Sequence, residues 1–117
     1  MELGIQTLTL NTSNLDSMGK LFAAMGFQLQ QGKVDKGSDF LRGRIGFVEL
    51  TLMSIPQMTR AESPGIGLRI QVQNIEKVLS TLRELEKIQI IMDVEYLHEG
   101  KTALVLDPDG RSIEICG

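Results

Sequence analysis

The stretch that decides the fold is LVLDPDGRSIEIC, residues 104–116, near the end of this 117-residue chain. The apolar run 104–106, and the alternation of Ile113 and Ile115 with polar residues, predict two short strands. Between them, DPDG (107–110) is typical of a tight turn, because proline presets φ and glycine adopts conformations that other residues resist. The stretch therefore predicts strand, turn and strand.

A carboxylate lies at the centre of the second predicted strand. Glu114 stands between Ile113 and Ile115, and successive side chains of a strand point to opposite faces of the sheet. Glu114 must therefore face away from the side on which the two isoleucines are buried. Because a carboxylate held in the middle of a strand is unusual, Glu114 is a candidate functional residue.

The composition limits the classes of protein to which the chain can belong. A length of 117 residues suggests one domain, or two very small half-domains that share a core. With 42% hydrophobic and 23% charged residues the chain is typical of soluble globular proteins, and a net charge of −3 predicts no nucleic-acid partner. No apolar run is long enough to predict a membrane span or a signal peptide. A single cysteine, Cys116, excludes an internal disulfide and favours the reducing cytoplasm.

The sequence pattern repeats after a shift of sixty positions, which indicates an internal duplication. In each half, alternating apolar residues predict a strand, an asparagine is placed to cap a helix, and apolar residues at spacings of three and four predict the helix. The corresponding positions are Leu8 and Leu68, Asn14 and Asn74, and Phe22 and Leu82.

Each half of the chain ends in a strand with a central glutamate. These strands are FVEL (47–50) and SIEI (112–115), so that Glu49 corresponds to Glu114. A segment with proline and glycine around polar residues, 57–65, is the predicted linker, and it divides a single domain of residues 1–117 into module 1 (1–56) and module 2 (66–117). The pattern alone predicts an α+β fold with duplicated antiparallel sheets.

The duplicated pattern and the closing run DPDGRSIEI (107–115) resemble the glyoxalase I/bleomycin-resistance/dioxygenase group, the vicinal oxygen chelate (VOC) superfamily. The resemblance covers essentially the whole chain. It implies tandem βαβββ modules that form a curled, half-open mixed sheet around a cavity. It also implies a small-molecule ligand and a homodimer, and in some relatives each cavity is built from modules of two chains.

The resemblance further implies a set of metal ligands. In the metal-using members each module supplies one ligand, usually histidine or glutamine, from its first strand and a glutamate from its last, here Glu49 and Glu114. The matching first-strand position of module 2 is Gly67, which has no side chain. In module 1 the shift of sixty points to Thr7, although a bulge in the strand could turn Gln6 inward instead. Gln6 and Thr7 therefore both remain candidates.

A divalent metal ion is thus an implied cofactor whose donor set is incomplete. Two carboxylates and at most one amide make a poor site for Zn²⁺ or Ni²⁺ and a partial one for Mn²⁺ or Mg²⁺. Arg69 lies two residues after Gly67, on the same strand face, and its guanidinium could compensate the two carboxylates where the metal would be. The alternative is an exposed strand edge on which Arg69 is simply solvated.

Two classes of function compete. One is a glyoxalase I-type carbon–sulfur lyase, similar to lactoylglutathione lyase, in which a metal holds the reacting oxygens and Glu114 or Glu49 transfers the proton. The other is a non-catalytic protein that sequesters a small molecule or an antibiotic. A metal-dependent dioxygenase is disfavoured, because its iron would require two histidines and one carboxylate. In either case the residues expected to contact the ligand are Arg69, Thr7, Thr9 and Tyr96.

Overall fold

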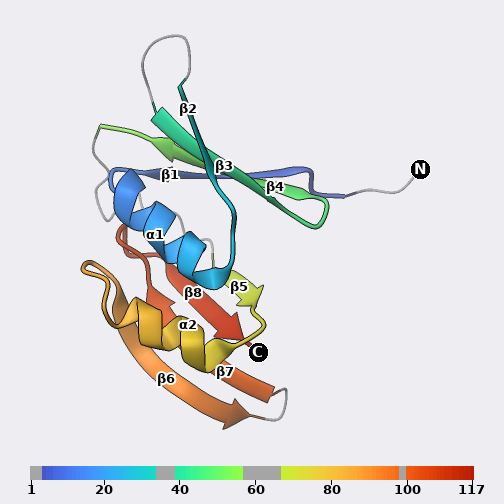
Figure 1. The fold of residues 1–117 in the computed structure, drawn as a ribbon, viewed down its shortest axis with the longest axis vertical. Helices are drawn as coiled ribbons and strands as arrows, with labels where there is room; N and C mark the ends of the chain where they lie inside the picture. Colours follow the sequence, from blue (N-terminus) through green and yellow to red (C-terminus); the bar gives the residue numbers. More distant parts are fainter. Residues whose placement is uncertain (1–3, 34–38, 57–66, 98–99) are drawn as a thin grey trace.

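The computed structural model describes residues 4–33, 39–56, 67–97 and 100–117, and it shows the predicted order of elements twice over (Figure 1). Module 1 contains β1 (Thr7–Thr12), α1 (Leu15–Met25), β2 (Gln30–Lys33), β3 (Asp39–Ile45) and β4 (Val48–Ser54). Module 2 contains β5 (Leu68–Gln71), α2 (Ile75–Leu82), β6 (Gln89–Leu97), β7 (Gly100–Leu106) and β8 (Ser112–Cys116). The predicted linker 57–65 lies outside the described residues.

The two modules have the same topology. The strand order is β1-β4-β3-β2 in one sheet and β5-β8-β7-β6 in the other, and in each the first strand runs parallel to the last while the remaining pairs are antiparallel. The α+β class and the tandem βαβββ modules are therefore confirmed. The described strands form two separate four-stranded sheets, which occupy opposite ends of the molecule and are not closed into a barrel (Figure 1).

A single hydrophobic core joins the modules. The helices contact each other, and each packs against strands of its own sheet. No helix among the described residues is long and apolar enough to cross a membrane. The buried apolar side chains come from α1, α2 and both sheets, and include Leu10, Met18, Phe22, Leu52, Leu79, Leu82, Val105, Ile113 and Ile115.

The two helix starts differ although the sequence places an asparagine at both. The Asn74 side chain caps α2 by accepting a hydrogen bond from the Lys77 backbone N–H at 3.1 Å. Asn14 occupies the same position before α1, but its side chain makes no capping hydrogen bond. Its amide nitrogen donates instead to Asp109 Oδ1 at 3.0 Å, and its amide oxygen accepts from Lys87 Nζ at 3.0 Å. Both partners belong to module 2.

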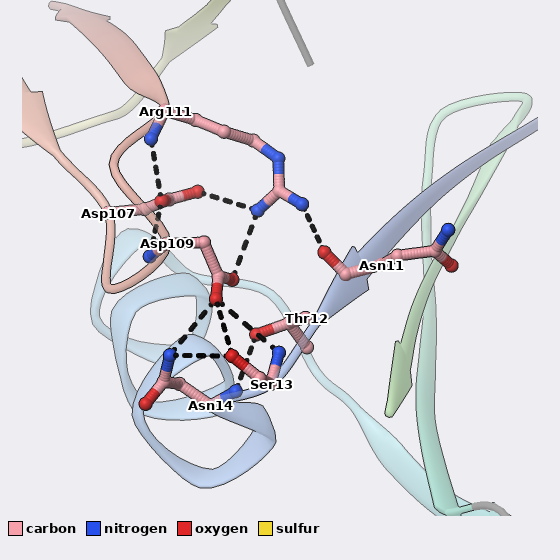
Figure 2. Close-up of polar contacts among 7 residues, drawn as sticks. All are labelled: Asn11, Thr12, Ser13, Asn14, Asp107, Asp109 and Arg111. Carbon is pink, nitrogen blue, oxygen red and sulfur yellow. Dashed lines mark hydrogen bonds and ion pairs between the residues drawn. The ribbon is translucent and has the colours of Figure 1, made fainter. Parts of the chain in front are cut away.

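A buried arginine lies at this junction (Figure 2). The Arg111 side chain is fully buried, and its Nη1 lies 3.1 Å from Asp107 Oδ2 and 3.2 Å from Asp109 Oδ2. Its Nη2 donates to the backbone oxygen of Asn11 on β1. The Asp107 carboxylate also accepts the backbone N–H groups of Asp109 and Arg111, each at 2.9 Å. The turn between β7 and β8 is therefore bonded to the end of β1 and the start of α1.

Replacement of Arg111 with methionine should destabilise the protein strongly. The substitution leaves the buried Asp107 carboxylate without its cation, which costs about 3–5 kcal/mol in proteins. The matched control is Arg83→Met, because Arg83 forms an ion pair with Asp93 on the surface, where such pairs contribute only about 0–1 kcal/mol. The free energy of unfolding would be measured by urea denaturation. Equal losses in the two variants would contradict a stabilising role for the buried pair.

Candidate functional site

Glu49 lies on the sheet face that points away from the hydrophobic core. Leu50 and Leu52 follow it on β4 and are buried in the core. Residues two positions apart lie on the same face of a strand unless a bulge intervenes, and adjacent residues lie on opposite faces.

 The pairing of β4 with β1 and with β3 has no such irregularity, so both leucines face the core and Glu49 faces away from it. In the register, Glu49 is the partner of Thr7 on β1 and of Arg44 on β3.

Glu49 forms its ion pair with an arginine that the sequence analysis missed. Arg42 Nε lies 3.4 Å from Glu49 Oε1, and both side chains are partly exposed. Arg42 is also held by Thr51, whose Oγ1 accepts a hydrogen bond from Nε at 3.1 Å, and by Phe40, whose ring centroid lies 4.6 Å from the guanidinium carbon. The available signal was the alternation of arginines along 39–45, but it becomes informative only once the pairing of β3 with β4 is known.

Glu114 forms an ion pair with Arg69. The two residues are register partners on the parallel strands β8 and β5, and Arg69 Nε lies 3.4 Å from Glu114 Oε1. Both side chains are partly exposed, so the pair stabilises the fold by about 1 kcal/mol at most. The predicted contact between Arg69 and a strand glutamate is therefore present. It involves Glu114, whereas Glu49 contacts Arg42.

The register also shows which residues stand beside the two glutamates. Thr7 is the partner of Glu49, while Gln6 precedes β1 and accepts the Glu49 backbone N–H through its carbonyl oxygen at 2.8 Å. In module 2 the partner of Glu114 is Arg69, and Gly67 precedes β5. The shift of sixty in the sequence matches Thr7 with Gly67, but the strand register matches Thr7 with Arg69.

The donor set around the glutamates does not fit a metal ion. A guanidinium group lies 3.4 Å from each carboxylate, and its positive charge opposes the binding of a cation there. Within the described ranges, no group of three or more histidine, cysteine, aspartate or glutamate residues could hold a metal. The side chains beside the carboxylates are a threonine and an arginine, where Zn²⁺ or Ni²⁺ would require imidazole.

A cavity of about 820 Å³ lies beside Glu49. Gln6, Thr7, Arg44 and Phe47 line it together with Glu49, and all of its described lining residues belong to module 1. A neighbouring cavity of about 580 Å³ shares Arg44 and Glu49 and is also lined by Arg42. Of the predicted site residues, the structure therefore brings Gln6, Thr7 and Glu49 together around one space.

The other two expected ligand contacts lie elsewhere. Thr9 is on the same strand face as Thr7, one full strand repeat further along β1. Tyr96 is near the end of β6, where its side chain is 77% exposed and where Lys101 Nζ lies 5.5 Å from the centroid of its ring. Strand β7 separates β6 from β8, so Tyr96 does not lie next to Glu114.

Lys101 also forms an ion pair that shifts the pKa values of both of its partners. Its Nζ donates a hydrogen bond to Glu76 Oε1 at 2.6 Å and so connects β7 to the first turn of α2. This hydrogen bond lowers the pKa of Glu76 below its ordinary value of 4.5 and raises the pKa of Lys101 above its ordinary value of 10.5.

Comparison with known proteins adds a family-model match and a set of structures of the same fold. The model described as "Lactoylglutathione lyase, putative-like, N-terminal" matches residues 4–54. The glyoxalase family protein from Enterococcus faecalis is 24% identical, with a TM-score of 0.67 over 97% of each chain. No protein among those with curated functions matches the chain.

Two further structures of the same fold have a named activity. The trypanothione-dependent glyoxalase I of Leishmania major is 20% identical, with a TM-score of 0.69 over 99% of this chain and 87% of that one. FosX of Listeria monocytogenes, a fosfomycin resistance protein in complex with Mn(II) and 1S,2S-dihydroxypropylphosphonic acid, is 13% identical, with a TM-score of 0.68 over 100% of this chain and 93% of that one. At these identities the likeness establishes the fold alone.

The ion pair of Glu76 and Lys101 should make stability depend on pH at both extremes. The lowered pKa of Glu76 gives a contribution that is present above pH 4.5 and is lost as the pH falls through the folded-state pKa. The raised pKa of Lys101 gives a contribution that is present below pH 10.5 and is lost as the pH rises through the folded-state pKa. Thermal unfolding of Glu76→Gln should therefore approach that of the wild type at both extremes and fall below it between them. A constant difference at all pH values, or the same profile in the control Glu84→Gln, would contradict the assignment.

Proposed function

We propose that the chain is a member of the glyoxalase/VOC superfamily that binds a small molecule without a resident metal ion. The observation that carries this proposal is that each strand glutamate already has a guanidinium group beside it. Arg42 lies 3.4 Å from the Glu49 carboxylate, and Arg69 lies 3.4 Å from the Glu114 carboxylate. A cation is therefore already supplied to each carboxylate by the chain itself. The first-strand side chains beside the two glutamates are Thr7 and Arg69, neither of which offers the imidazole that Zn²⁺ or Ni²⁺ would use.

These ion pairs suit reversible binding. Both are partly exposed, so a ligand can reach the guanidinium and the carboxylate without unfolding the sheet. Charge-assisted hydrogen bonds to a guanidinium are strong and directional, which lets a ligand group compete with the carboxylate for the same donors. The cavity of about 820 Å³ beside Glu49 is large enough for a small organic molecule. The biological role that this arrangement favours is sequestration of a ligand, as in resistance-type binding proteins.

A glyoxalase I-type lyase is the second candidate, and the match of residues 4–54 to a lactoylglutathione lyase-like model favours it. In that reaction Glu49 or Glu114 would transfer the proton between adjacent carbons. The carboxylate concerned would first have to separate from its arginine, because a salt-bridged carboxylate is a weaker base.

Protein purified without chelator should contain no stoichiometric metal. Ni²⁺, Co²⁺, Zn²⁺ and Mn²⁺ should not raise its melting temperature by binding to Glu49 or Glu114. The measurements are elemental analysis and thermal unfolding with each ion, on wild type and on Glu49→Gln and Glu114→Gln. Stabilisation by one ion that either variant abolishes would overturn the metal-free proposal. Isomerisation of a hemithioacetal by the same sample would then favour the lyase.

We also propose a homodimer in which two polar sheet faces meet. One is the face of the β1–β4 sheet that carries Glu49, and the other is the face of the β5–β8 sheet that carries Glu114 in a second copy. Glu49 and Glu114 lie on different sheets, and the described residues that line the cavity at Glu49 come from module 1. Light scattering coupled to size exclusion should give about twice the chain mass of 13.0 kDa. A mass equal to one chain at micromolar concentration would contradict the dimer.

A further inference from the structure

Arg44 is a cation that lies beside Glu49 but does not form an ion pair with it. It stands directly across from Glu49 in the pairing of β3 with β4, yet the carboxylate pairs with Arg42. Arg42 is fixed in place by Thr51 and by the ring of Phe40. Across the described ranges 4–33, 39–56, 67–97 and 100–117, Arg44 has no ion pair or hydrogen bond through its side chain.

The position of Arg44 gives it access to both cavities. It lines the cavity of about 820 Å³ with Gln6 and Thr7, and the cavity of about 580 Å³ with Gln28 and Gln30. These neighbours carry amide and hydroxyl groups, which can donate hydrogen bonds to an oxygen that the guanidinium also binds. A ligand group at Arg44 would therefore meet further neutral donors on either side.

The charges around the two cavities favour an anion. Among the residues that the structure describes, the charged side chains that line them are Arg42, Arg44 and Glu49. Because Arg42 already neutralises Glu49, the charge of Arg44 is left over, in a chain whose net charge is −3. The planar guanidinium matches the two oxygens of a carboxylate or phosphonate, with which it forms paired hydrogen bonds.

Two large apolar side chains lie at the same cavity. Phe47 is 92% exposed and Ile5 is 72% exposed, and both line the space beside Glu49. Exposed apolar groups at the edge of a polar cavity are typical of a binding surface, because they gain from being covered. We infer that the ligand is an amphipathic oxyanion, a carboxylate or phosphonate with an apolar group, whose oxygens bind Arg44 and whose apolar part covers Phe47 and Ile5. This inference rests on the proposed function, because it names the ligand class of the same site.

The test uses phenylacetate and phenylphosphonate as probes, with phenylacetamide as the neutral analogue. Binding to the full chain would be followed by amide chemical shifts in NMR titrations of wild type, Arg44→Gln and the control Arg83→Gln. Both variants remove one exposed positive charge, but Arg83 pairs with Asp93 in module 2. We expect at least one acid to shift the amides of Thr7 and Phe47. Its affinity should fall about ten-fold or more in Arg44→Gln and stay unchanged in Arg83→Gln, and phenylacetamide should bind wild type more weakly than phenylacetate.

Three results would overturn the inference: equal affinity of the acids for wild type and Arg44→Gln, equal binding of phenylacetamide and phenylacetate, or no acid binding at Thr7 and Phe47. The acid that binds with the higher affinity would identify carboxylate or phosphonate as the source of the oxyanion. Failure of the metal-free proposal is distinguishable, because a metal that depends on Glu49 would be detected by elemental analysis whether or not Arg44→Gln weakens acid binding.

Discussion

The arrangement of the two modules depends on the buried ion pair of Arg111. A buried guanidinium is tolerated when its charge is compensated, and here Asp107 and Asp109 supply that charge at Nη1 while the Asn11 carbonyl accepts a hydrogen bond from Nη2. The two aspartates belong to the turn of module 2, whereas Asn11 belongs to β1 of module 1. The same interaction that satisfies the buried charge therefore fixes β1 relative to β8, the strand that carries Glu114.

Much of the fold could be predicted from the sequence, because its signals are local. Alternation, helical spacing and the Asp107-Pro108-Asp109-Gly110 turn all act over a few residues, and the duplication repeats them. The role of Arg111 could not be predicted, since its burial requires a carbonyl one hundred positions away in sequence. Asn14 shows the same limit: its position matches that of Asn74, but Asp109 and Lys87 bind its side chain instead of leaving it to cap α1.

The candidate site was predictable to the extent that it follows from strand alternation. Alternation placed Glu114 on the face opposite its isoleucine neighbours and placed Arg69 on the face of the ligand position. It could not identify Arg42, because a change of one residue in the pairing of β3 with β4 would move that side chain to the other face. It could not choose between Gly67 and Arg69 as the partner of Glu114 either, because the register of two parallel strands depends on the crossover that joins them.

The duplicated modules pair their glutamates with arginines in two different ways, and this difference makes the sites unequal. Glu114 pairs with Arg69 on its parallel neighbour β5, and its antiparallel neighbour on β7 is Leu104. Glu49 pairs with Arg42 on its antiparallel neighbour β3, which also carries Arg44, and Thr7 is its parallel neighbour. One polar face thus has an additional cation and the other has an apolar side chain at the equivalent place. If the two faces meet in a dimer, the combined site has one charged end and one apolar end, which is the pattern that an amphipathic anion requires.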